Sequence, residues 1–556
     1  MHPISSIDLK IGSDQKDFLR IKNPAVTVFI GPNNSGKSML LREIQAFFAN
    51  DHIPPSFILQ NIKMAQPSSE VKKMMLDRLL NEVGLPLDIA EETSFQINRG
   101  NISFGTTTKD LFERAGDVES QGRYYHTLFL RNEVLLLDGS SRLGLTGVRG
   151  IDSYTQPKTS FGRLFLKDET RATLRAVLYK AFGKYLTLDA VTSPGSFMLR
   201  YSITSPRTLE LEKGLTAESI SHLVSGQPVD QMSDGVKALT GILIELYAGD
   251  PRILIIDEPE AFLHPSLARL LGHELSKPSA QVAQKNVFIA THSPNFLIGC
   301  VQAASSVNIV RLTYADGIST ARHLDAVSVK ALFRNPLLRS VNAIEALFYD
   351  HVVVVEADSD RAFYDEINLR LVAADDSRGI KNCLFLRAQN KQTVPNIVGP
   401  LRSLGIPAAG IVDVDIYKDG GSVWSNLLNA FGVPKVSQTG MAALRANLKL
   451  KFDEANKNPG RNGGINVLDG EDKKAGNDLF DQLAQYGLFV VRHGELESWL
   501  PGIASQSNKA DWLVEALTNL GEDPASTEYK QPASGDVWDF IGEIEKWCKN
   551  PNRKGL

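Results

Sequence analysis

The chain has 556 residues, too many for one hydrophobic core, so we expect several lobes or two larger units. Hydrophobic residues make up 43% of it and charged residues 22%, as in ordinary folded proteins, and a formal net charge of −4 does not by itself indicate a nucleic-acid partner. The three cysteines are far apart in sequence, which argues against a disulfide framework or a zinc site. No signal-peptide pattern and no apolar run of about 18 residues is found, so we expect a cytoplasmic protein without a membrane segment.

The first motif with chemical meaning lies between a short apolar strand and a helix. Residues 25–30 read AVTVFI, Gly31–Ser38 reads GPNNSGKS, and residues 39–48 have helical periodicity. This context predicts a Walker A loop, in which backbone N–H groups and a helix N-terminus surround phosphate oxygens. Lys37 is expected to reach the β- and γ-phosphates of ATP, and the Ser38 hydroxyl to bind Mg²⁺. The other residues expected to contact nucleotide are Gly31, Asn34, Ser35 and Gly36.

The stretch from about residue 45 to residue 225 is expected to hold insertions. Residues 128–143 are interpreted as a strand pair with a hairpin turn at Asp138-Gly139. Gln156 is the candidate for the glutamine of a Q-loop. Sustained heptads are absent, which excludes the long coiled-coil arms of SMC-like ATPases.

Ser233-Asp234-Gly235 begins a helix and resembles the signature motif of ABC ATPases, although its wording departs from LSGGQ. A serine and free amides at a helix N-terminus form a second phosphate site, which in ABC enzymes completes the nucleotide pocket of a partner subunit. A simple N-cap formed by Ser233 is the alternative. Because the chain has one phosphate loop and one such segment, we expect a homodimer or a higher even oligomer.

Two further apolar strands carry polar residues at their ends. RILIIDEP predicts a buried strand ending in Asp257 and Glu258, with Asp257 in the Mg²⁺ shell and Glu258 as the general base that polarises water. NVFIATHSP predicts another strand, ending in Thr291 and His292. The position of His292, after the acidic pair, matches the switch histidine that senses the γ-phosphate in ABC ATPases.

A second α/β region begins after residue 350. VVVVEADSD predicts a buried strand ending in Glu356, with Asp360 four residues later, and GIVDVDIY predicts a strand ending in Asp413 and Asp415. Alternate residues of a strand point the same way, so both aspartates are expected to face one site, where carboxylates suit Mg²⁺ or Mn²⁺. One glutamate and a DxD at two strand ends is the arrangement of a Toprim domain, and exposed acids after strands are the alternative.

The remaining sequence offers weaker signals. FVV followed by GELESWL predicts a strand with Glu495 and Glu497 after it. Glu497 is the better candidate for a second metal ion, and an ordinary acid at a helix N-terminus is the alternative. The polar segment 454–477 is interpreted as a loop that carries Lys473 and Lys474. Near the end of the chain, GDVWDFIGEIEKWCKN predicts an amphipathic helix.

These motifs together resemble the OLD (overcoming lysogenization defect) family, over roughly residues 20–500. The pieces that carry the resemblance are GPNNSGKS, IIDEPEAFLHP, ATHSPNF, VVVVEADSD, IVDVDIY and GELESWL. OLD proteins are ATPases with a metal-dependent nuclease domain, and several serve bacterial anti-phage defence. The resemblance implies that Glu356, Asp360, Asp413, Asp415 and Glu497 are nuclease ligands. One departure is Ala357, where the Toprim motif has glycine; if that position requires a positive φ, alanine is strained there.

The expected fold is α/β: an ABC-type ATPase domain with insertions (1–330), a helical connector (331–350), a Toprim-like domain (351–505) and a helical tail (506–556). The preferred function is an ATP-regulated, metal-dependent endonuclease in phage defence, with nucleic acid as substrate. The alternative is an ATPase sensor or scaffold, whose degenerate Toprim-like half holds a partner toxin or nuclease from the same defence operon. Ala357 and the lack of an obvious basic cluster favour this alternative.

Overall fold

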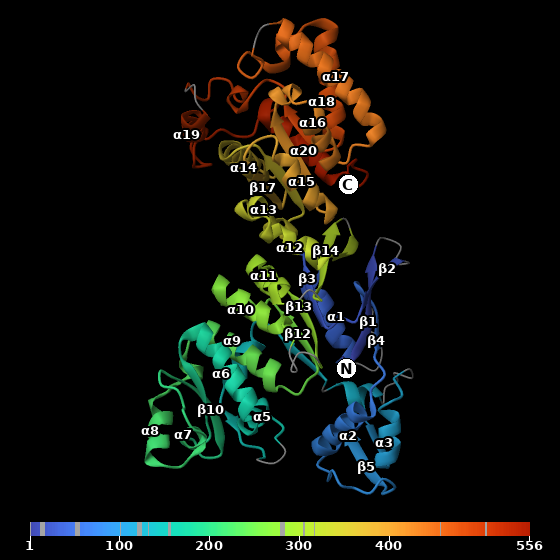
Figure 1. Ribbon diagram of the computed structural model, residues 1–556, viewed down its shortest axis with the longest axis vertical. Helices are drawn as coiled ribbons and strands as arrows, with labels where there is room; N and C mark the ends of the chain where they lie inside the picture. Colours follow the sequence, from blue (N-terminus) through green and yellow to red (C-terminus); the bar gives the residue numbers. More distant parts are fainter. Residues whose placement is uncertain are drawn as a thin grey trace. The chain divides into compact units, whose positions relative to one another are not determined.

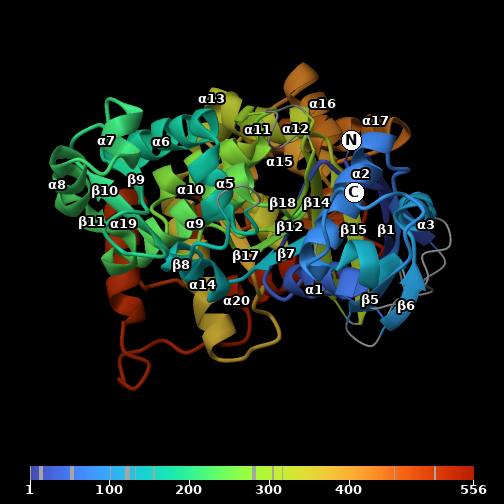
Figure 2. The same ribbon diagram turned by 90° about the horizontal axis from the view of Figure 1, so that it is seen from below.

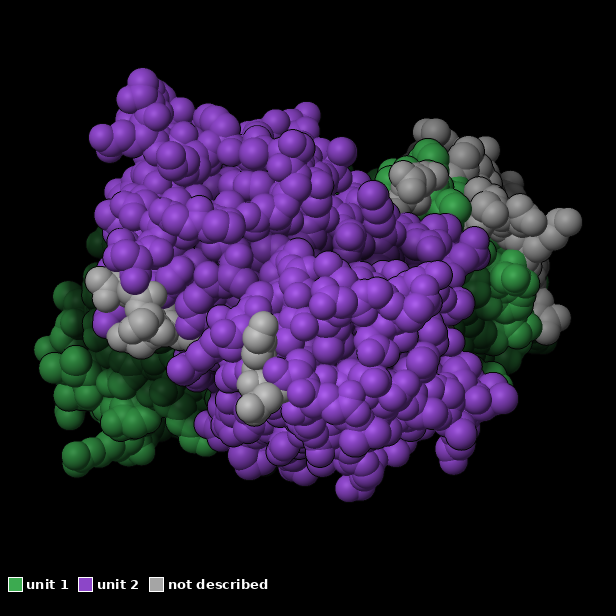
Figure 3. All heavy atoms as spheres, turned by 90° about the horizontal axis from the view of Figure 1, so that it is seen from above, with its two compact units in different colours: residues 1–330 green, residues 331–556 purple. Residues whose placement is uncertain are grey.

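The computed structural model describes residues 2–11, 17–49, 56–99, 102–118, 125–131, 133–153, 157–278, 284–303, 306–315, 317–455, 458–505 and 509–555. The chain divides into two compact units, Met1–Lys330 and Ala331–Leu556, which Figure 3 shows in separate colours. The helix α12 (Ala326–Arg334) spans the division in sequence. Each unit is described by itself below.

A six-stranded sheet forms the centre of the first unit, in the order β15-β14-β3-β13-β12-β7. Its strands are β3 (Val26–Ile30), β7 (Val134–Leu137), β12 (Ile253–Asp257), β13 (Asn286–Ala290), β14 (Asn308–Ala315) and β15 (Ile318–Leu324). All neighbours are parallel except β14 and β15. Strands buried on both faces need continuous apolar runs, which VTVFI and ILII supply.

Helices cover both faces of this sheet. The helix α1 (Lys37–Ala49) lies on one side, and α10 (Pro265–Ser276) and α11 (Pro294–Ala303) pack together on the other (Figure 1). The apolar face of α1 shares a core with a three-stranded antiparallel sheet of β1 (Ile4–Ile11), β2 (Asp17–Lys22) and β4 (Leu59–Met64). The helix α9 (Asp234–Ala248) is buried along most of its length.

The insertions form two groups of elements. The first contains α2 (Ser69–Val83), β5 (Phe95–Arg99), β6 (Ile102–Thr106), α3 (Thr108–Arg114) and the π-helix η1 (His126–Leu130). The second is gathered around β9 and β10 (Figure 2) and contains β8 (Arg149–Gly150), α5 (Ser160–Leu166), α6 (Asp168–Phe182), β9 (Tyr185–Asp189), β10 (Ser196–Ser202), α7 (Leu209–Lys213), α8 (Ala217–Ser225), β11 (Gln227–Pro228) and η3 (Val229–Gln231).

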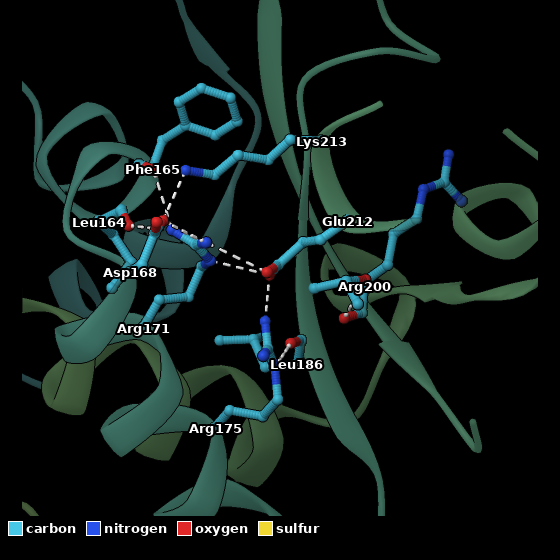
Figure 4. Close-up of polar contacts among 10 residues, drawn as sticks. Leu164, Phe165, Asp168, Arg171, Arg175, Leu186, Arg200, Glu212 and Lys213 are labelled. Atoms are coloured by element: carbon cyan, nitrogen blue, oxygen red, sulfur yellow. Dashed lines mark hydrogen bonds and ion pairs between the residues drawn. The ribbon is translucent and has the colours of Figure 1, made fainter. Parts of the chain in front are cut away.

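A buried ion network holds the second insertion together (Figure 4). The carboxylate of Glu212 on α7 is 4% exposed and accepts hydrogen bonds from Arg171 at 2.8 Å and from Arg175, both on α6. Arg171 and Lys213 also bind Asp168. Such a network contributes little net stability, but removing one member leaves an uncompensated buried charge, so it specifies how α6 packs against α7.

The second unit is built on a parallel sheet in the order β17-β16-β18-β19. Its strands are β16 (His351–Val355), β17 (Cys383–Arg387), β18 (Ala408–Asp413) and β19 (Leu488–Val491). Its helices are α13 (Pro336–Ser340), η4 (Ala343–Phe348), α14 (Asp358–Ala373), α15 (Val394–Ser403), η5 (Val414–Lys418), α16 (Gly421–Ala430), α17 (Lys435–Glu454), η6 (Gly464–Val467), α18 (Gly470–Gln485), η7 (Leu496–Ser498), α19 (Lys509–Leu520) and α20 (Asp536–Lys549).

One core of the second unit joins its sheet to its last helices. Val353 and Val355 of β16 pack with Phe363 of α14, and with Trp538 and Ile541 of α20. The segment after residue 505 therefore belongs to the same core as the sheet. Among the helices that the structure describes, none is both long and apolar enough to cross a membrane.

Two local expectations were wrong. Residues 128–143 do not form a hairpin: β7 pairs in parallel with β12, and after Asp138-Gly139 the chain enters the 3₁₀ helix η2 (Ser141–Thr146). Asp138 begins this turn by accepting the N–H groups of Ser140 and Ser141, which is the capping role of a short acid rather than that of a hairpin residue. Lys473 and Lys474 lie in the helix α18, not in a loop.

Candidate active sites

The phosphate loop between β3 and α1 depends on backbone conformations that few residues adopt. Gly31 and Gly36 have φ values of +138° and +89°, and Asn34 has +61°. A Cβ atom at Gly31 would lie 2.1 Å from the carbonyl oxygen of Leu312, so only glycine fits there. The Lys37 ammonium, 4% exposed, donates to the carbonyl oxygens of Gly31 and Pro32 and to Ser35 Oγ. Backbone N–H groups and this ammonium are the donors that a polyphosphate requires.

Two oxygen atoms suited to Mg²⁺ lie side by side at the end of this loop. Ser38 Oγ donates a hydrogen bond of 3.0 Å to Asp257 Oδ1, and Asp257 is the last residue of β12. Burial raises the pKa of the Asp257 carboxyl, and the Ser38 hydroxyl opposes the rise. A hydroxyl and a carboxylate are hard oxygen ligands, which is the ligand type that magnesium prefers.

Glu258 and His292 face each other beyond β12 and β13. The backbone of Glu258 is in the left-handed region, at φ +50°, and its side chain is 52% exposed. His292 Nε2 lies 3.8 Å from Glu258 Oε1. Burial, reinforced by the charge of Lys37, lowers the pKa of His292 to about 4, so its imidazole is neutral at pH 7. The two side chains expected to act on water and on the γ-phosphate therefore lie together.

Two further residues shape this edge, and sequence reasoning missed both. Glu260 accepts the backbone N–H of His292 at 2.9 Å, and burial raises the pKa of its carboxyl. Arg142, from η2, donates to the carbonyl oxygen of Glu258 at 2.6 Å. The DEPE motif offered a signal for Glu260, because its second glutamate is two residues after Glu258. No sequence signal indicated Arg142.

Gln156, the Q-loop candidate, lies outside the described residues. The strand beside β12 is β7.

Ser233 and Gly235 lie at the start of α9. Ser233 occupies the N-cap position and is exposed, but its side chain makes no capping hydrogen bond. A Cβ atom at Gly235 would be 2.5 Å from the carbonyl oxygen of Phe262, so glycine lets α9 approach the turn after Glu258. The Ser233 side chain therefore does not cap the helix in this structure.

At the acidic edge of the second unit, residues from adjacent parallel strands meet. Glu356 follows β16, and its Oε1 accepts the backbone N–H of Asp413, the last residue of β18, at 2.9 Å. Burial raises the pKa of the Glu356 carboxyl to about 7, and the charges of Asp360 and Asp415 add to the rise. Glu356 is thus a partly buried carboxyl group close to other acids.

Asp360 and Ala357 form the start of α14. Asp360 is 4% exposed, and its Oδ2 accepts the backbone N–H of Ala357 at 3.0 Å. Ala357 has φ −135°, an extended conformation open to any residue, so alanine in place of glycine is not strained here. Asp360 caps its own helix as well as lying near Glu356.

The expectation that Asp413 and Asp415 share one face of a strand was wrong. The strand β18 ends at Asp413, and the chain continues as the 3₁₀ helix η5, so the alternation of a strand does not reach Asp415. Asp415 instead forms an ion pair with Lys391, with Nζ 2.8 Å from Oδ1. Lys391 also lies 3.7 Å from Asp419.

Glu497 lies in η7, after β19, and lines a cavity of about 740 Å³. Its Oε2 is buried without a hydrogen-bond partner among the described residues. The cavity is also lined by Arg461, His493, Glu495, Trp499 and Asp536. Asp413 and Val491 are register partners of β18 and β19, and the lining residues His493 and Glu495 follow β19 in sequence.

The acidic edge offers side chains of the type that bind a divalent cation, but these side chains are not arranged to hold one. All the candidate ligands are carboxylates, as Mg²⁺ and Mn²⁺ prefer. Within the part of the chain that the structure describes, however, no three His, Cys, Asp or Glu side chains are grouped so as to hold a metal ion. Lys391 already provides positive charge beside Asp415.

The raised pKa of Glu356 makes stability depend on pH. Because the folded protein binds the proton more tightly than the unfolded chain, stability is lost as pH rises from about 4.5 to about 7, by about 3 kcal/mol in all. We expect Glu356→Gln to raise the free energy of unfolding at pH 8 and to change it little near pH 4.5. Urea unfolding in EDTA at both pH values measures this.

The exposed Glu522→Gln is the matched control for that measurement, since a surface carboxyl has no burial cost to remove. Equal stability of Glu356→Gln and wild type at pH 8 would contradict the burial of a charged Glu356.

Comparisons with known proteins bear on the first unit. Residues 210–298, which include Ser233, Asp257, Glu258 and His292, match the family model described as "AAA domain, putative AbiEii toxin, Type IV TA system". No curated protein matches the chain.

Several solved structures are similar at low identity. A Smc head domain from Pyrococcus furiosus, bound to the C-terminal domain of ScpA, is 12% identical over 60% of this chain and 99% of its own, with a TM-score of 0.31. The SMC head domain from Thermotoga maritima is 14% identical over 58% and 99%, with a TM-score of 0.29. The protein cbiO1 from Clostridium perfringens, part of the ABC transporter complex cbiONQ, is 16% identical over 60% and 97%, with a TM-score of 0.27.

These TM-scores are too low to carry an argument about function. The family match and the geometry of the phosphate loop agree, however, with one general conclusion. Residues 210–298 of the first unit therefore form part of an AAA-type domain.

Proposed function

We propose that the chain is an ATP-regulated, metal-dependent endonuclease of the OLD family that acts in anti-phage defence. The observation that carries the nuclease half is the pairing of Glu356 with Asp413 at the ends of adjacent parallel strands. Open parallel sheets place their chemistry at this edge. A partly buried carboxyl group beside two other acids is costly to ionise, and a perturbed pKa of this kind is typical of functional sites.

In the ATPase site, each residue is proposed to have one task. Lys37 and the loop amides bind the phosphates, and Ser38 and Asp257 hold Mg²⁺, which neutralises charge on the β- and γ-phosphates when bound. Glu258 orients and polarises the attacking water. A neutral His292 has one N–H donor and one acceptor, so it can bond the γ-phosphate without adding a charge.

In the nuclease site, Glu356, Asp360, Asp413, Asp415 and Glu497 are the proposed metal ligands. A divalent cation held by these carboxylates would supply charge stabilisation to a reacting phosphodiester. The Asp413 N–H holds the Glu356 carboxylate at the sheet edge. The ammonium of Lys391 reaches the same edge and is suited to contact a phosphate oxygen of nucleic acid.

A second candidate function is an ATPase sensor or scaffold, in which the acidic unit holds a partner protein and cuts nothing. Two observations favour it. Lys391 neutralises Asp415 internally, and the described acids are not grouped as metal ligands. Under this hypothesis the Lys391–Asp415 pair has replaced a metal ion as the balancing charge.

For the nucleotide site, we expect Lys37→Ala to lose tight ATP binding, because the loop then lacks its phosphate-binding cation. Glu258→Gln should bind ATP normally and hydrolyse it very slowly. Calorimetry and phosphate release measure the two effects. Equal ATP affinity of wild type and Lys37→Ala would overturn the assignment of the loop.

For the assembly, we expect ATP to join two copies of the chain, with Ser233 of one copy near Lys37 of the other. Glu258→Gln with ATP should stabilise this state, because turnover no longer dissolves it. Light scattering with and without ATP tests it, and Glu258→Gln/Lys37→Ala is the control that cannot bind nucleotide. A strict monomer at every concentration would argue against the dimer.

For the nuclease, we expect Asp413→Asn to abolish cleavage of plasmid DNA or RNA with Mg²⁺ or Mn²⁺, while ATP hydrolysis continues. Asparagine keeps the backbone N–H that binds Glu356, so only the carboxylate charge is lost. Asp375→Asn, at an exposed acid of the same unit, is the matched control.

Wild-type protein that cuts no nucleic acid with either metal, with or without ATP, would favour the scaffold instead. In that case Lys391→Ala, which frees Asp415, is the variant to test for metal binding by calorimetry.

A further inference from the structure

We infer that Arg142 is a positioning residue for ATP hydrolysis: it fixes the backbone turn from which Glu258 is directed at the nucleotide. The inference rests on the proposed role of Glu258 as general base and adds a residue that no sequence motif indicated. Arg142 touches neither the phosphates nor the water in this proposal; it acts through the carbonyl oxygen of Glu258.

The topology brings Arg142 to this place. The strand β7 pairs in parallel with β12, with Leu137 beside Ile256, so the residues after the two strands meet at one edge of the sheet. After β7, the Asp138 turn directs the chain into η2, which packs against α9. Arg142 therefore comes from a segment more than 100 residues before Glu258 in sequence and lies directly against its turn.

The contact itself is buried and specific. Arg142 is 1% exposed, and its Nη1 donates to the Glu258 carbonyl oxygen at 2.6 Å. The same oxygen accepts the N–H of Ala261 at 3.0 Å, which closes the turn. A guanidinium is costly to bury, and it is found buried where paired charges compensate it.

The turn that Arg142 contacts is unusual in its backbone. Glu258 has φ +50° and Phe262 has φ +70°, a region that residues other than glycine seldom occupy unless their surroundings hold them there. The Arg142 guanidinium bonds the carbonyl of Glu258, and its central carbon lies 5.9 Å from the centroid of the Phe262 ring. A conformation held in this way is consistent with a functional demand on the direction of the Glu258 side chain.

The charges around Arg142 suit the same role. The carboxylates of Asp257, Glu258 and Glu260 all interact with its guanidinium, and they oppose the lowering of its pKa by burial. Without that cation, three acids at one strand end would repel one another and displace the Glu258 side chain. The same turn approaches α9, because the carbonyl of Phe262 lies close to Gly235.

A purely structural role for Arg142 makes different predictions, so the two can be separated by kinetics. We expect Arg142→Met, which keeps an unbranched apolar stem but removes the guanidinium, to lower kcat by about 10- to 100-fold, because the base is then misdirected. The KM for ATP and the affinity for ATP, measured by calorimetry, should change by less than about twofold. Arg142→Lys keeps the positive charge and a hydrogen-bond donor, so its kcat should lie between those of the wild type and Arg142→Met.

A double-mutant cycle identifies the residue through which Arg142 acts. In the Glu258→Gln background, Arg142→Met should cause no further loss of turnover, because the base that it positions is already gone. Thermal melting checks that each variant is folded, and if Arg142→Met gives no cooperative transition, Arg142→Lys alone decides between the outcomes.

Three results would overturn the inference: wild-type kcat in the folded variants, a rise in KM as large as the fall in kcat, or a fully multiplicative loss in the double variant. Wild-type turnover in Glu258→Gln is a separate result, since it would remove the proposed function of Glu258 whatever Arg142 does.

Discussion

The parallel pairing of β3, β13 and β12 is the constraint on which the first unit depends. Because these strands run in the same direction in register, the phosphate loop, the acidic pair and His292 must all emerge at one edge, although the loop is more than 200 residues before the other two in sequence. The hydrogen bond from Ser38 to Asp257 connects the phosphate loop directly to the acidic pair. The second unit repeats the principle with β16 and β18, whose ends bring Glu356 to the backbone of Asp413.

Sequence patterns predicted those elements whose signal is local. An apolar run followed by GPNNSGKS or DEP defines both a strand and the turn at its end, and these strands are found. The predictions that failed depended on partners far away. Asp138-Gly139 has the composition of a hairpin, but pairing of β7 with β12 decided its conformation. Asp415 was assigned to a strand that ends two residues earlier, and its partner Lys391 could not be deduced from spacing.

The differences from the family's sequence motifs are not equally important for the structure. Ala357 replaces a glycine of the resembled family without strain, because its backbone is extended. The arrangement of the acids matters more: Glu356, Asp360 and Asp415 are close enough to interact electrically, while Lys391 supplies the balancing charge. Whether the edge cuts nucleic acid therefore depends on a competition between an ammonium group and a divalent cation for the same carboxylates, a question of relative affinity rather than of motif.

The place of α20 in the core has a consequence for biosynthesis. Trp538 and Ile541 pack against β16, which leaves the ribosome long before them. Part of the apolar face of this sheet consequently stays uncovered until α20 has been translated. All strands of the first unit are synthesised much earlier, so that unit can fold first. If the second unit is a nuclease, the core that supports its acidic edge is complete only once α20 has been translated.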